Sequence, residues 1–217
     1  MSVAIVGYIL TSLVAYLLGS IPTGFLVGKA RGIDIRAIGS GNIGATNVFR
    51  ALGVPAGVFV MLCDAAKGWI AVKVAAVCLA RWIDPAASQL SREWFCILAG
   101  VCVVLGHNYT CWLHFKGGKG IATSAGVLLE LVPEALLIIL AVFVIVLALT
   151  RIMSLASIAA SFTLPFATWL RGGSLTMIIV TGALAVLAIY KHKANIRRLL
   201  NGTEGRIGVK TPAEAPK

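Results

Sequence analysis

Residues 134–150, EALLIILAVFVIVLALT, form an uninterrupted apolar run in which Glu134 is the single charged residue. About 20 apolar residues in a row are enough for one helix to cross the hydrocarbon core of a bilayer. The rest of the chain is similar, with 59% hydrophobic residues, 12% charged residues and a mean hydropathy of +0.95. Because the apolar runs are continuous rather than alternating, they predict a helical bundle and not a transmembrane β-barrel.

Seven segments are long and apolar enough to be candidate membrane spans. They cover residues 3–25, 54–80, 94–113, 119–132, 134–150, 154–170 and 174–191. The first lacks the basic n-region and cleavage site of a signal peptide, so we expect it to be retained. The segment 119–132 is the weakest, since it is short and contains Thr123 and Ser124, and a broken or partly inserted helix is the alternative.

The fold class predicted from these segments is an all-α integral membrane protein, a seven-transmembrane-helix bundle. Residues 1–200 are expected to form a single helical membrane domain. Residues 201–217 are polar and contain proline, which predicts a flexible tail.

Lysine and arginine are distributed unequally between the two ends of these spans. Three lie at one end, Arg81, Arg92 and Arg171. Fourteen lie at the other end, namely Lys29, Arg31, Arg36, Arg50, Lys116, Lys119, Arg151, Lys191, Lys193, Arg197, Arg198, Arg206, Lys210 and Lys217. The positive-inside rule then places the N-terminus outside and the C-terminus in the cytoplasm. The net charge of +11 needs no other explanation, and the lack of a basic, aromatic-bearing soluble domain excludes nucleic acid as an expected partner.

The cysteines show no pairing pattern. None of the five stands in a CxxC spacing, and most lie within apolar runs, as small packing residues do. They are Cys63, Cys78, Cys96, Cys102 and Cys111. We expect reduced cysteines and no metal site.

Residues 38–50, IGSGNIGATNVFR, form a long glycine-rich polar stretch between apolar segments. Its glycines, Gly39, Gly41 and Gly44, allow φ > 0 and can turn successive N–H groups toward an anion. Its neutral hydrogen-bonding side chains are Ser40, Asn42, Thr46 and Asn47. Arg50 adds a bidentate donor suited to phosphate. An ordinary turn between helices is the alternative, but this stretch is longer than such a turn needs, so we predict a loop over residues 39–50 that binds an anion.

A second glycine-rich stretch, FKGGKGIATS at residues 115–124, places Lys119 between glycines at the predicted start of a helix. Free N–H groups and the helix dipole favour an anion at such a position. A Walker A nucleotide loop is excluded because Gly120, not Ser or Thr, follows Lys119, and Leu113 stands where the first glycine is needed. Anchoring by the positive-inside rule is the other explanation for Lys116 and Lys119.

Three further polar groups occur near or within the apolar segments. Ser154 and Ser157 share one helix face, either for substrate contact or for close helix packing. Asp64 and Lys67 also stand three residues apart inside an apolar span, where charges are costly, so we expect them to pair with each other or with a neighbouring helix. His192, with Asn195 three residues later, lies at the end of the last span and is either a surface residue or part of a site. None of the histidines begins an HxxxxD motif, which excludes the acyltransferases that rely on one.

Together these motifs resemble the bacterial acyl-phosphate-dependent glycerol-3-phosphate acyltransferases, the PlsY family. The resemblance rests on GSIPTGF, GSGNIGATNVFR, DAAKG, GH, FKGGKGIATSAG, RIMSLAS and YKHKANIRRLLNGTE, which extend over the whole membrane domain. One departure is NYTCW at residues 108–112, where relatives often have a proline.

The resemblance implies transfer of a fatty acyl group from acyl phosphate to the 1-hydroxyl of glycerol 3-phosphate. The products would be lysophosphatidic acid and inorganic phosphate, in the first acylation step of phospholipid synthesis. It further implies a bacterial inner-membrane protein with its site at the cytoplasmic face, in contact with membrane lipids and without a cofactor, and we expect a monomer. The candidate catalytic residues are His192, Asn195, Arg50 and Lys119. The candidate substrate-binding residues are Ser40, Gly41, Asn42, Gly44, Thr46, Asn47, Gly118, Thr123, Ser154 and Ser157.

Two other functions compete with the enzyme. A transporter of phosphate esters would also use broken helices and anion-binding helix ends, but it needs a polar path through the outer half of the bundle. The charged residues there lie mostly in loops, which favours an enzyme. A lipid-binding scaffold is the third alternative, and it does not explain why so many phosphate donors are present.

Overall fold

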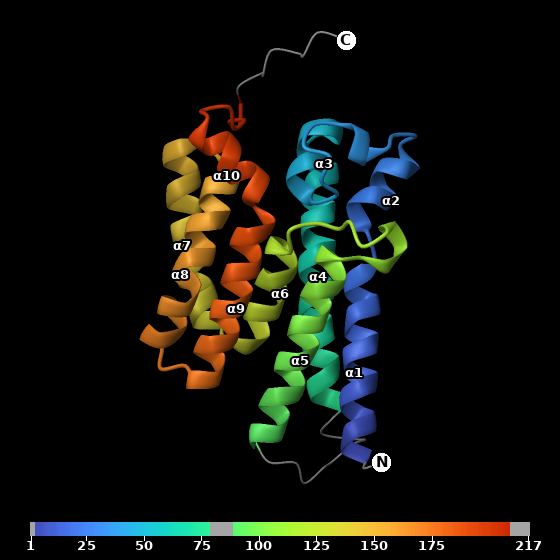
Figure 1. Cartoon of the computed structure of the whole chain (residues 1–217), viewed down its shortest axis with the longest axis vertical. Coiled ribbons are helices and arrows are strands. Elements are labelled where there is room, and N and C mark those ends of the chain that lie inside the picture. Colours follow the sequence, from blue (N-terminus) through green and yellow to red (C-terminus); the bar gives the residue numbers. More distant parts are fainter. Residues whose placement is uncertain (1–2, 79–88, 209–217) are drawn as a thin grey trace. The chain divides into compact units, whose positions relative to one another are not determined.

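The computed structural model describes residues 3–78 and 89–208, and in those ranges every regular element is a helix. The helices form two compact units, residues 1–133 and 134–217 (Figure 1). Unit 1 contains α1 (Val3–Ser20), α2 (Thr23–Ala30), η1 (Ile35–Ala37), α3 (Ala45–Leu52), α4 (Val54–Cys78), α5 (Gln89–Asn108), η3 (Cys111–Leu113) and α6 (Ile121–Leu131). Unit 2 contains α7 (Pro133–Thr150), α8 (Met153–Leu170), α9 (Leu175–Lys191) and α10 (Lys193–Leu200), with Pro133 at the boundary. The all-α prediction is confirmed; the sequence patterns did not indicate the division into two units.

Four helical segments in the described residues are long and apolar enough to cross a membrane. They are Ile5–Ala30, Arg92–Leu113, Pro133–Thr150 and Met153–Leu170. A fifth is possible if α9 and α10, which meet at a bend of 59°, form one broken span. α4 has 25 residues but carries Asp64, Lys67 and Lys73. The 11 residues of α6 span about 16 Å, roughly half of a hydrocarbon core. The count of seven spans and their orientation therefore stay predictions.

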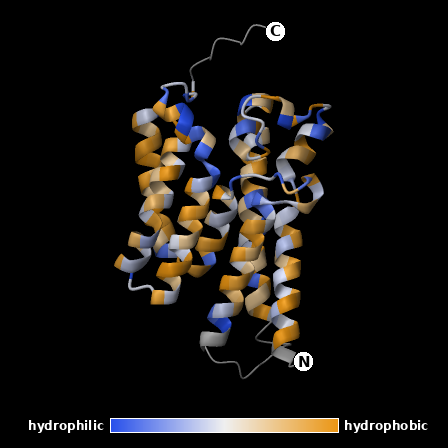
Figure 2. Cartoon of the chain, viewed as in Figure 1, coloured by the Kyte–Doolittle hydropathy of each residue, from blue (hydrophilic) through white to orange (hydrophobic). Residues whose placement is uncertain are grey.

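Large apolar side chains remain exposed along the helices, as expected for surfaces that face lipid. Leu149 is 80% exposed, Leu137 67% and Trp169 66%. Figure 2 shows hydrophobic residues along the helices and hydrophilic residues gathered mainly at the helix ends and connections. A water-soluble protein would rarely leave so much apolar surface uncovered. Many large apolar side chains thus lie on the surface of the helices, beside others that are buried in the core.

The prediction of a loop over residues 39–50 is correct for its first half and wrong for its second. α3 begins at Ala45, after Gly44 in an extended conformation, and continues to Leu52. This short helix is amphipathic and buries Asn47 and Val48. It forms because its apolar face packs on α4, an interaction that the local composition of glycine, asparagine and threonine does not reveal.

Glycines allow two helix pairs in unit 1 to approach closely. A Cβ atom on Gly19 would lie 2.0 Å from the carbonyl oxygen of Val103, so α1 and α5 touch backbone to backbone there. A Cβ on Gly126 would lie 1.8 Å from the carbonyl oxygen of Ala65, and one on Gly68 2.1 Å from that of Thr123. Small residues at helix interfaces are the usual means of packing helices in membranes.

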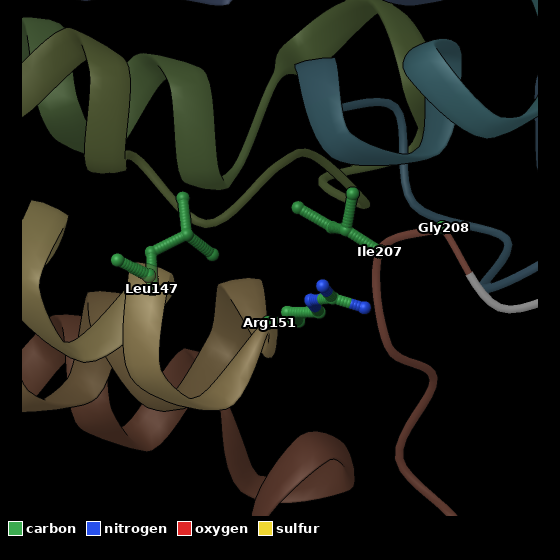
Figure 3. A pocket seen from close by; sticks show the side chains of 5 residues that line it. Leu147, Arg151, Ile207 and Gly208 are labelled. Carbon is green, nitrogen blue, oxygen red and sulfur yellow. The ribbon is translucent and has the colours of Figure 1, made fainter.

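The first residues of the expected tail are attached to unit 2. The backbone N–H of Ile207 donates to the carbonyl oxygen of Arg151 at 2.8 Å, next to the left-handed conformation of Arg151. A hollow of about 520 Å³ lies beside this bond (Figure 3). It is lined by Leu147, Ala148, Arg151, Ile207 and Gly208, none of which is a predicted site residue. The remainder of the predicted flexible tail, residues 209–217, lies outside the described residues.

The close approach of α4 and α6 gives a test of the fold. Gly126→Ala should lower the apparent melting temperature in detergent by about 3–10 °C, because the added methyl group overlaps the backbone of α4. Gly182→Ala in α9 is the matched control, since its methyl group would meet nothing within 4 Å. It should leave the melting temperature unchanged or raise it. Equal melting temperatures for the two variants would contradict the packing described.

Candidate active site

The turn before α3 is held together by one buried side chain, that of Asn47. Its Nδ2 donates to the carbonyl oxygens of Ile35 at 2.9 Å and Ile38 at 3.0 Å. Its Oδ1 accepts the backbone N–H of Ser40 at 3.0 Å. Both amide hydrogens are therefore used within the protein, and Asn47 is only 2% exposed. The structure thus places Asn47, a predicted substrate-binding residue, in the role of shaping the loop.

Other polar groups of the same segment are not used by this frame, with Ser40 exposed and Asn42 and Thr46 half-buried. No described residue hydrogen-bonds to the hydroxyls of Ser40 and Thr46 or to the Nδ2 of Asn42, whereas Asn42 Oδ1 accepts the N–H of Gly44 at 2.9 Å. Gly41 has a φ of 67°, which only glycine adopts without strain. The donors that remain suit an anion, because a phosphate offers acceptors and no strong donor at neutral pH.

The second glycine-rich segment lies flat on the end of α5. The N–H of Gly118 donates to the carbonyl oxygen of His107 at 3.0 Å, and that of Gly117 to the carbonyl oxygen of Asn108 at 3.2 Å. A Cβ on either glycine would lie 2.1 Å from an atom of His107, its carbonyl oxygen for Gly117 and its Nε2 for Gly118. A side chain at position 117 would therefore overlap the backbone of α5, and one at position 118 would displace the His107 ring. Gly120, with a φ of 79°, then turns the chain into α6.

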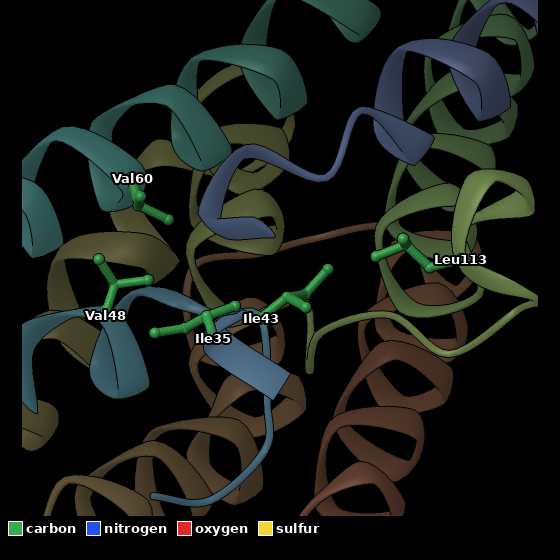
Figure 4. Close-up of a cluster of buried hydrophobic side chains, with 5 residues drawn as sticks. All are labelled: Ile35, Ile43, Val48, Val60 and Leu113. Atoms are coloured by element: carbon green, nitrogen blue, oxygen red, sulfur yellow. The ribbon is translucent and has the colours of Figure 1, made fainter. Parts of the chain in front are cut away.

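The two glycine-rich segments share one hydrophobic cluster. Ile43 of the first and Leu113, just before the second, pack with Ile35, Val48 and Val60 in unit 1 (Figure 4). Both segments are thus anchored on the same apolar base. Their cationic residues differ in exposure, since Arg50 is exposed on α3 and Lys119 is half-buried just before α6.

Thr123 stands apart from the other candidates. It is fully buried between α6 and α4, and its Oγ1 has no hydrogen-bond partner among the described residues. A substrate could not reach this hydroxyl without separating the two helices.

Unit 2 brings together Ser154, Asn195 and a residue that sequence reasoning did not select, Glu204. Ser154 Oγ and Asn195 Nδ2 both donate to Glu204 Oε1, at 2.8 Å and 2.7 Å. Arg198 Nε donates to Glu204 Oε2 at 2.6 Å. The carboxylate thereby connects the start of α8 to α10. Glu204 is the last residue of the motif YKHKANIRRLLNGTE, so the motif could have pointed to it. A carboxyl group in a polar segment is, however, normally expected to be exposed to solvent.

The environment of Glu204 favours its ionised form. Burial alone would raise the pKa of this carboxyl, but the hydrogen bonds from Asn195, Ser154 and Arg198 outweigh burial and hold the pKa below its usual range. The side chain is 4% exposed and carries its charge within this set of donors.

His192, at the bend between α9 and α10, is 2% exposed and has a defined tautomer. Its Nδ1 lies 2.8 Å from the carbonyl oxygen of Ala188, which can only accept a hydrogen bond, so Nδ1 carries the hydrogen. In the neutral ring, Nε2 then carries the lone pair and can accept a proton or a hydrogen bond. Ser157, by contrast, uses its hydroxyl to donate to the carbonyl oxygen of Met153 at 2.9 Å.

The described residues contain no group of three or more His, Cys, Asp or Glu side chains that could hold a metal ion. The four described cysteines, Cys63, Cys96, Cys102 and Cys111, are free thiols. Cys78 lies outside the residues whose side chains are described.

Comparisons with known proteins agree with these features. A sequence profile described as glycerol-3-phosphate acyltransferase matches residues 9–202. The chain is 41% identical over 204 residues to the glycerol-3-phosphate acyltransferase of Symbiobacterium thermophilum, covering 94% of this chain and 96% of that protein. It is 46% identical over 190 residues to the enzyme of the same name from Geotalea daltonii, covering 88% and 92%.

Solved structures give the same result for the fold. The chain is similar to the crystal structure of PlsY (YgiH), described as an integral membrane glycerol 3-phosphate acyltransferase, in its glycerol 3-phosphate form. The TM-score is 0.82 at 36% identity, covering 93% of this chain and 96% of that one. The lysophosphatidic acid form matches with a TM-score of 0.79.

These similarities first define a class: the chain is a multi-pass integral membrane protein and an acyltransferase. Within that class it belongs to the glycerol-3-phosphate acyltransferase family, and so to phospholipid synthesis. The family resemblance drawn from the motifs is confirmed.

The hydrogen bonds to Glu204 predict an acid-sensitive contribution to stability. Because the pKa is lower in the folded protein, ionised Glu204 stabilises the fold above its ordinary pKa of about 4.3, and this contribution is lost as the pH falls through the lowered value. Glu204→Gln should lower the melting temperature at pH 7 by about 5 °C and should remove this part of the decline in acid.

The control is Glu134→Gln, which removes an ion pair between Glu134 and Arg171 that is mostly exposed to solvent. It should change the melting temperature by no more than about 2 °C. Identical acid profiles for the wild type and Glu204→Gln would contradict the assignment.

Proposed function

We propose that this acyltransferase takes its acyl group from acyl phosphate and transfers it to the 1-hydroxyl of glycerol 3-phosphate, releasing lysophosphatidic acid and inorganic phosphate. The observation that carries the proposal is that the hydroxyls of Ser40 and Thr46 and the Nδ2 of Asn42 have no hydrogen-bond partner among the described residues, on a turn in unit 1 that is itself hydrogen-bonded. Both substrates bear a phosphate that such donors can bind. The names of the family relatives support glycerol 3-phosphate as acceptor.

The location we propose is the bacterial inner membrane, with the glycine-rich segments at the cytoplasmic face, the N-terminus outside and the C-terminus inside. The unequal distribution of lysine and arginine supports this orientation. We propose seven membrane segments, with α6 as a short one. Gly118 and Gly120, which precede α6, are buried, and irregular backbone is tolerated at membrane depth where protein covers it.

The proposed reaction is direct attack of the glycerol hydroxyl on the acyl carbonyl. Acyl phosphate is a mixed anhydride with a good leaving group, so no covalent acyl-enzyme is needed. Arg50, Lys119 and the backbone N–H groups of the two glycine-rich segments would hold phosphate and stabilise the charge that develops as it leaves. Asn42, Gly41 and Gly44 shape the first of these segments.

For the acceptor hydroxyl we propose a partner in His192. Since Nδ1 donates to Ala188, Nε2 is the atom that could accept the hydrogen of the hydroxyl and orient it. The proton leaves the hydroxyl as the new ester bond forms, and it passes either to Nε2 or to the departing phosphate, which would make the substrate its own base. Asn195 and Ser154, held by Glu204, belong to the same unit as His192.

The activity has a direct test. The purified protein, incubated with palmitoyl phosphate and glycerol 3-phosphate, should release inorganic phosphate only when both substrates are present. Lysophosphatidic acid should form in an equal amount, measured by mass spectrometry. No release of phosphate, together with counterflow of glycerol 3-phosphate in vesicles, would instead show a transporter.

Kinetics of a histidine variant distinguish orientation from proton transfer. If His192 orients the hydroxyl and phosphate takes the proton, His192→Ala should raise the KM for glycerol 3-phosphate about tenfold or more with kcat within about threefold of wild type. The control is His114→Asn, because His114 is exposed with a φ of 53° that asparagine tolerates. A fall in kcat of about a hundredfold or more at unchanged KM would assign proton transfer to His192 and contradict the orienting role.

A further inference from the structure

A buried polar cluster lies in unit 1 outside the residues that the proposed reaction uses. Lys67 Nζ lies 2.8 Å from Asp64 Oδ1 and 2.9 Å from His107 Nδ1. It also donates to the carbonyl oxygen of Ile21 at 3.1 Å, at the break between α1 and α2. The side chains of Asp64, Lys67 and His107 are only 4–6% exposed. The cluster thus joins three helical segments, and the expected pairing of Asp64 with Lys67 is confirmed.

The neighbouring acceptors of Lys67 indicate where the protons of this cluster lie. An ammonium group has three donors, and Lys67 has three neighbouring acceptors in Asp64 Oδ1, the Ile21 carbonyl oxygen and His107 Nδ1. The other assignment, a neutral Lys67 that accepts from an imidazolium, is disfavoured because the ordinary pKa of lysine lies about four units above that of histidine. Asp64 Oδ1 is also 3.5 Å from His107 Nδ1 but only 2.8 Å from Lys67 Nζ. His107 Nδ1 therefore accepts, and the hydrogen of the neutral ring is on Nε2.

The opposite edge of the His107 ring lies against the second glycine-rich segment. A Cβ on Gly118 would come within 2.1 Å of Nε2, so the ring occupies the space where a side chain would be. The carbonyl oxygen of the same residue accepts the N–H of Gly118 at 3.0 Å. One residue thus supports Gly118 through both its backbone and its ring, immediately before Lys119.

We propose that Lys67 is a positioning residue of this acyltransferase. Its ammonium holds His107 as the Nε2–H tautomer with the ring against Gly118, and the ring so held fixes the backbone that presents Lys119 and the start of α6. Asp64 and the Ile21 carbonyl oxygen keep Lys67 ionised in a membrane protein interior. The effect on catalysis rests on the proposed function, whereas the tautomer does not.

The variants must avoid leaving a buried charge without a partner. Lys67→Met alone would strand Asp64, which can prevent folding. We therefore compare the wild type with the double variant Asp64→Asn/Lys67→Met, which removes both buried charges together. Asparagine at position 64 keeps an oxygen near Thr23, which donates to Asp64 in the wild type.

The first measurement is 15N NMR of the full-length protein in detergent, labelled with 15N-histidine. The His107 signals are identified by their loss in His107→Gln. The wild type should show Nδ1 as an unprotonated nitrogen and Nε2 as protonated. The double variant should show a mixture of tautomers. A protonated Nδ1 in the wild type, or an unchanged tautomer in the double variant, would overturn the proposal.

The second measurement is steady-state kinetics with palmitoyl phosphate and glycerol 3-phosphate. Relative to the wild type, the double variant should show a KM for one of the two substrates raised about tenfold, with kcat changed by less than about threefold. If the double variant lost activity together with thermal stability while both KM values stayed unchanged, Lys67 would have a structural role alone, and the positioning role would be overturned. If the wild type itself released no phosphate, the proposed function would fail, while the NMR result would still decide the tautomer.

Discussion

Backbone groups that leave a helix inside a membrane protein need partners from the protein itself, because lipid offers none. Three irregular segments among the described residues of unit 1 satisfy this constraint, each with a specific group. At the break before Pro22, the Ile21 carbonyl oxygen receives the ammonium of Lys67. In the turn before α3, Asn47 bonds three backbone groups. After α5, the N–H groups of Gly117 and Gly118 return to the last carbonyl oxygens of that helix. Backbone groups of these segments are thus paired within the protein.

The same constraint divides the polar residues into two kinds. Some have their hydrogen-bonding capacity used by the protein, as Asn47 and Ser157 do. Others, such as Ser40 and Thr46, lie on the frame that the first kind builds, with hydroxyls that no described residue bonds. A rigid frame with unused donors can bind phosphate without first reorganising, which is what electrostatic preorganisation requires. Residue type alone does not separate the two kinds, since asparagine and serine occur in both.

Sequence reasoning was most successful where a single property decides the structure. The helices α7, α8 and α9 begin and end within one residue of the apolar runs at 134–150, 154–170 and 174–191, because hydropathy over such a length has no other interpretation. It failed for α3, whose formation depends on packing against α4. It also failed for Glu204, whose importance depends on three donors that lie 6, 9 and 50 residues earlier in the chain. These are tertiary effects, and no local pattern of residue types carries them. The motifs did locate the glycine-rich segments, since glycine is needed where a backbone must approach another closely.

The state of Glu204 bears on the choice between direct transfer and a covalent intermediate. Ser154 donates to this carboxylate at 2.8 Å, which resembles a nucleophile beside its base. An effective base, however, needs a pKa near the working pH, and three donors hold the pKa of Glu204 below its ordinary range. Such a carboxylate orients Ser154 and Asn195 but does not deprotonate a hydroxyl of far higher pKa. Ser157 is no better placed, because its hydroxyl is bonded to a carbonyl oxygen. Neither predicted serine is therefore activated as a nucleophile, and the proposed donor, an anhydride that already carries its leaving group, requires none.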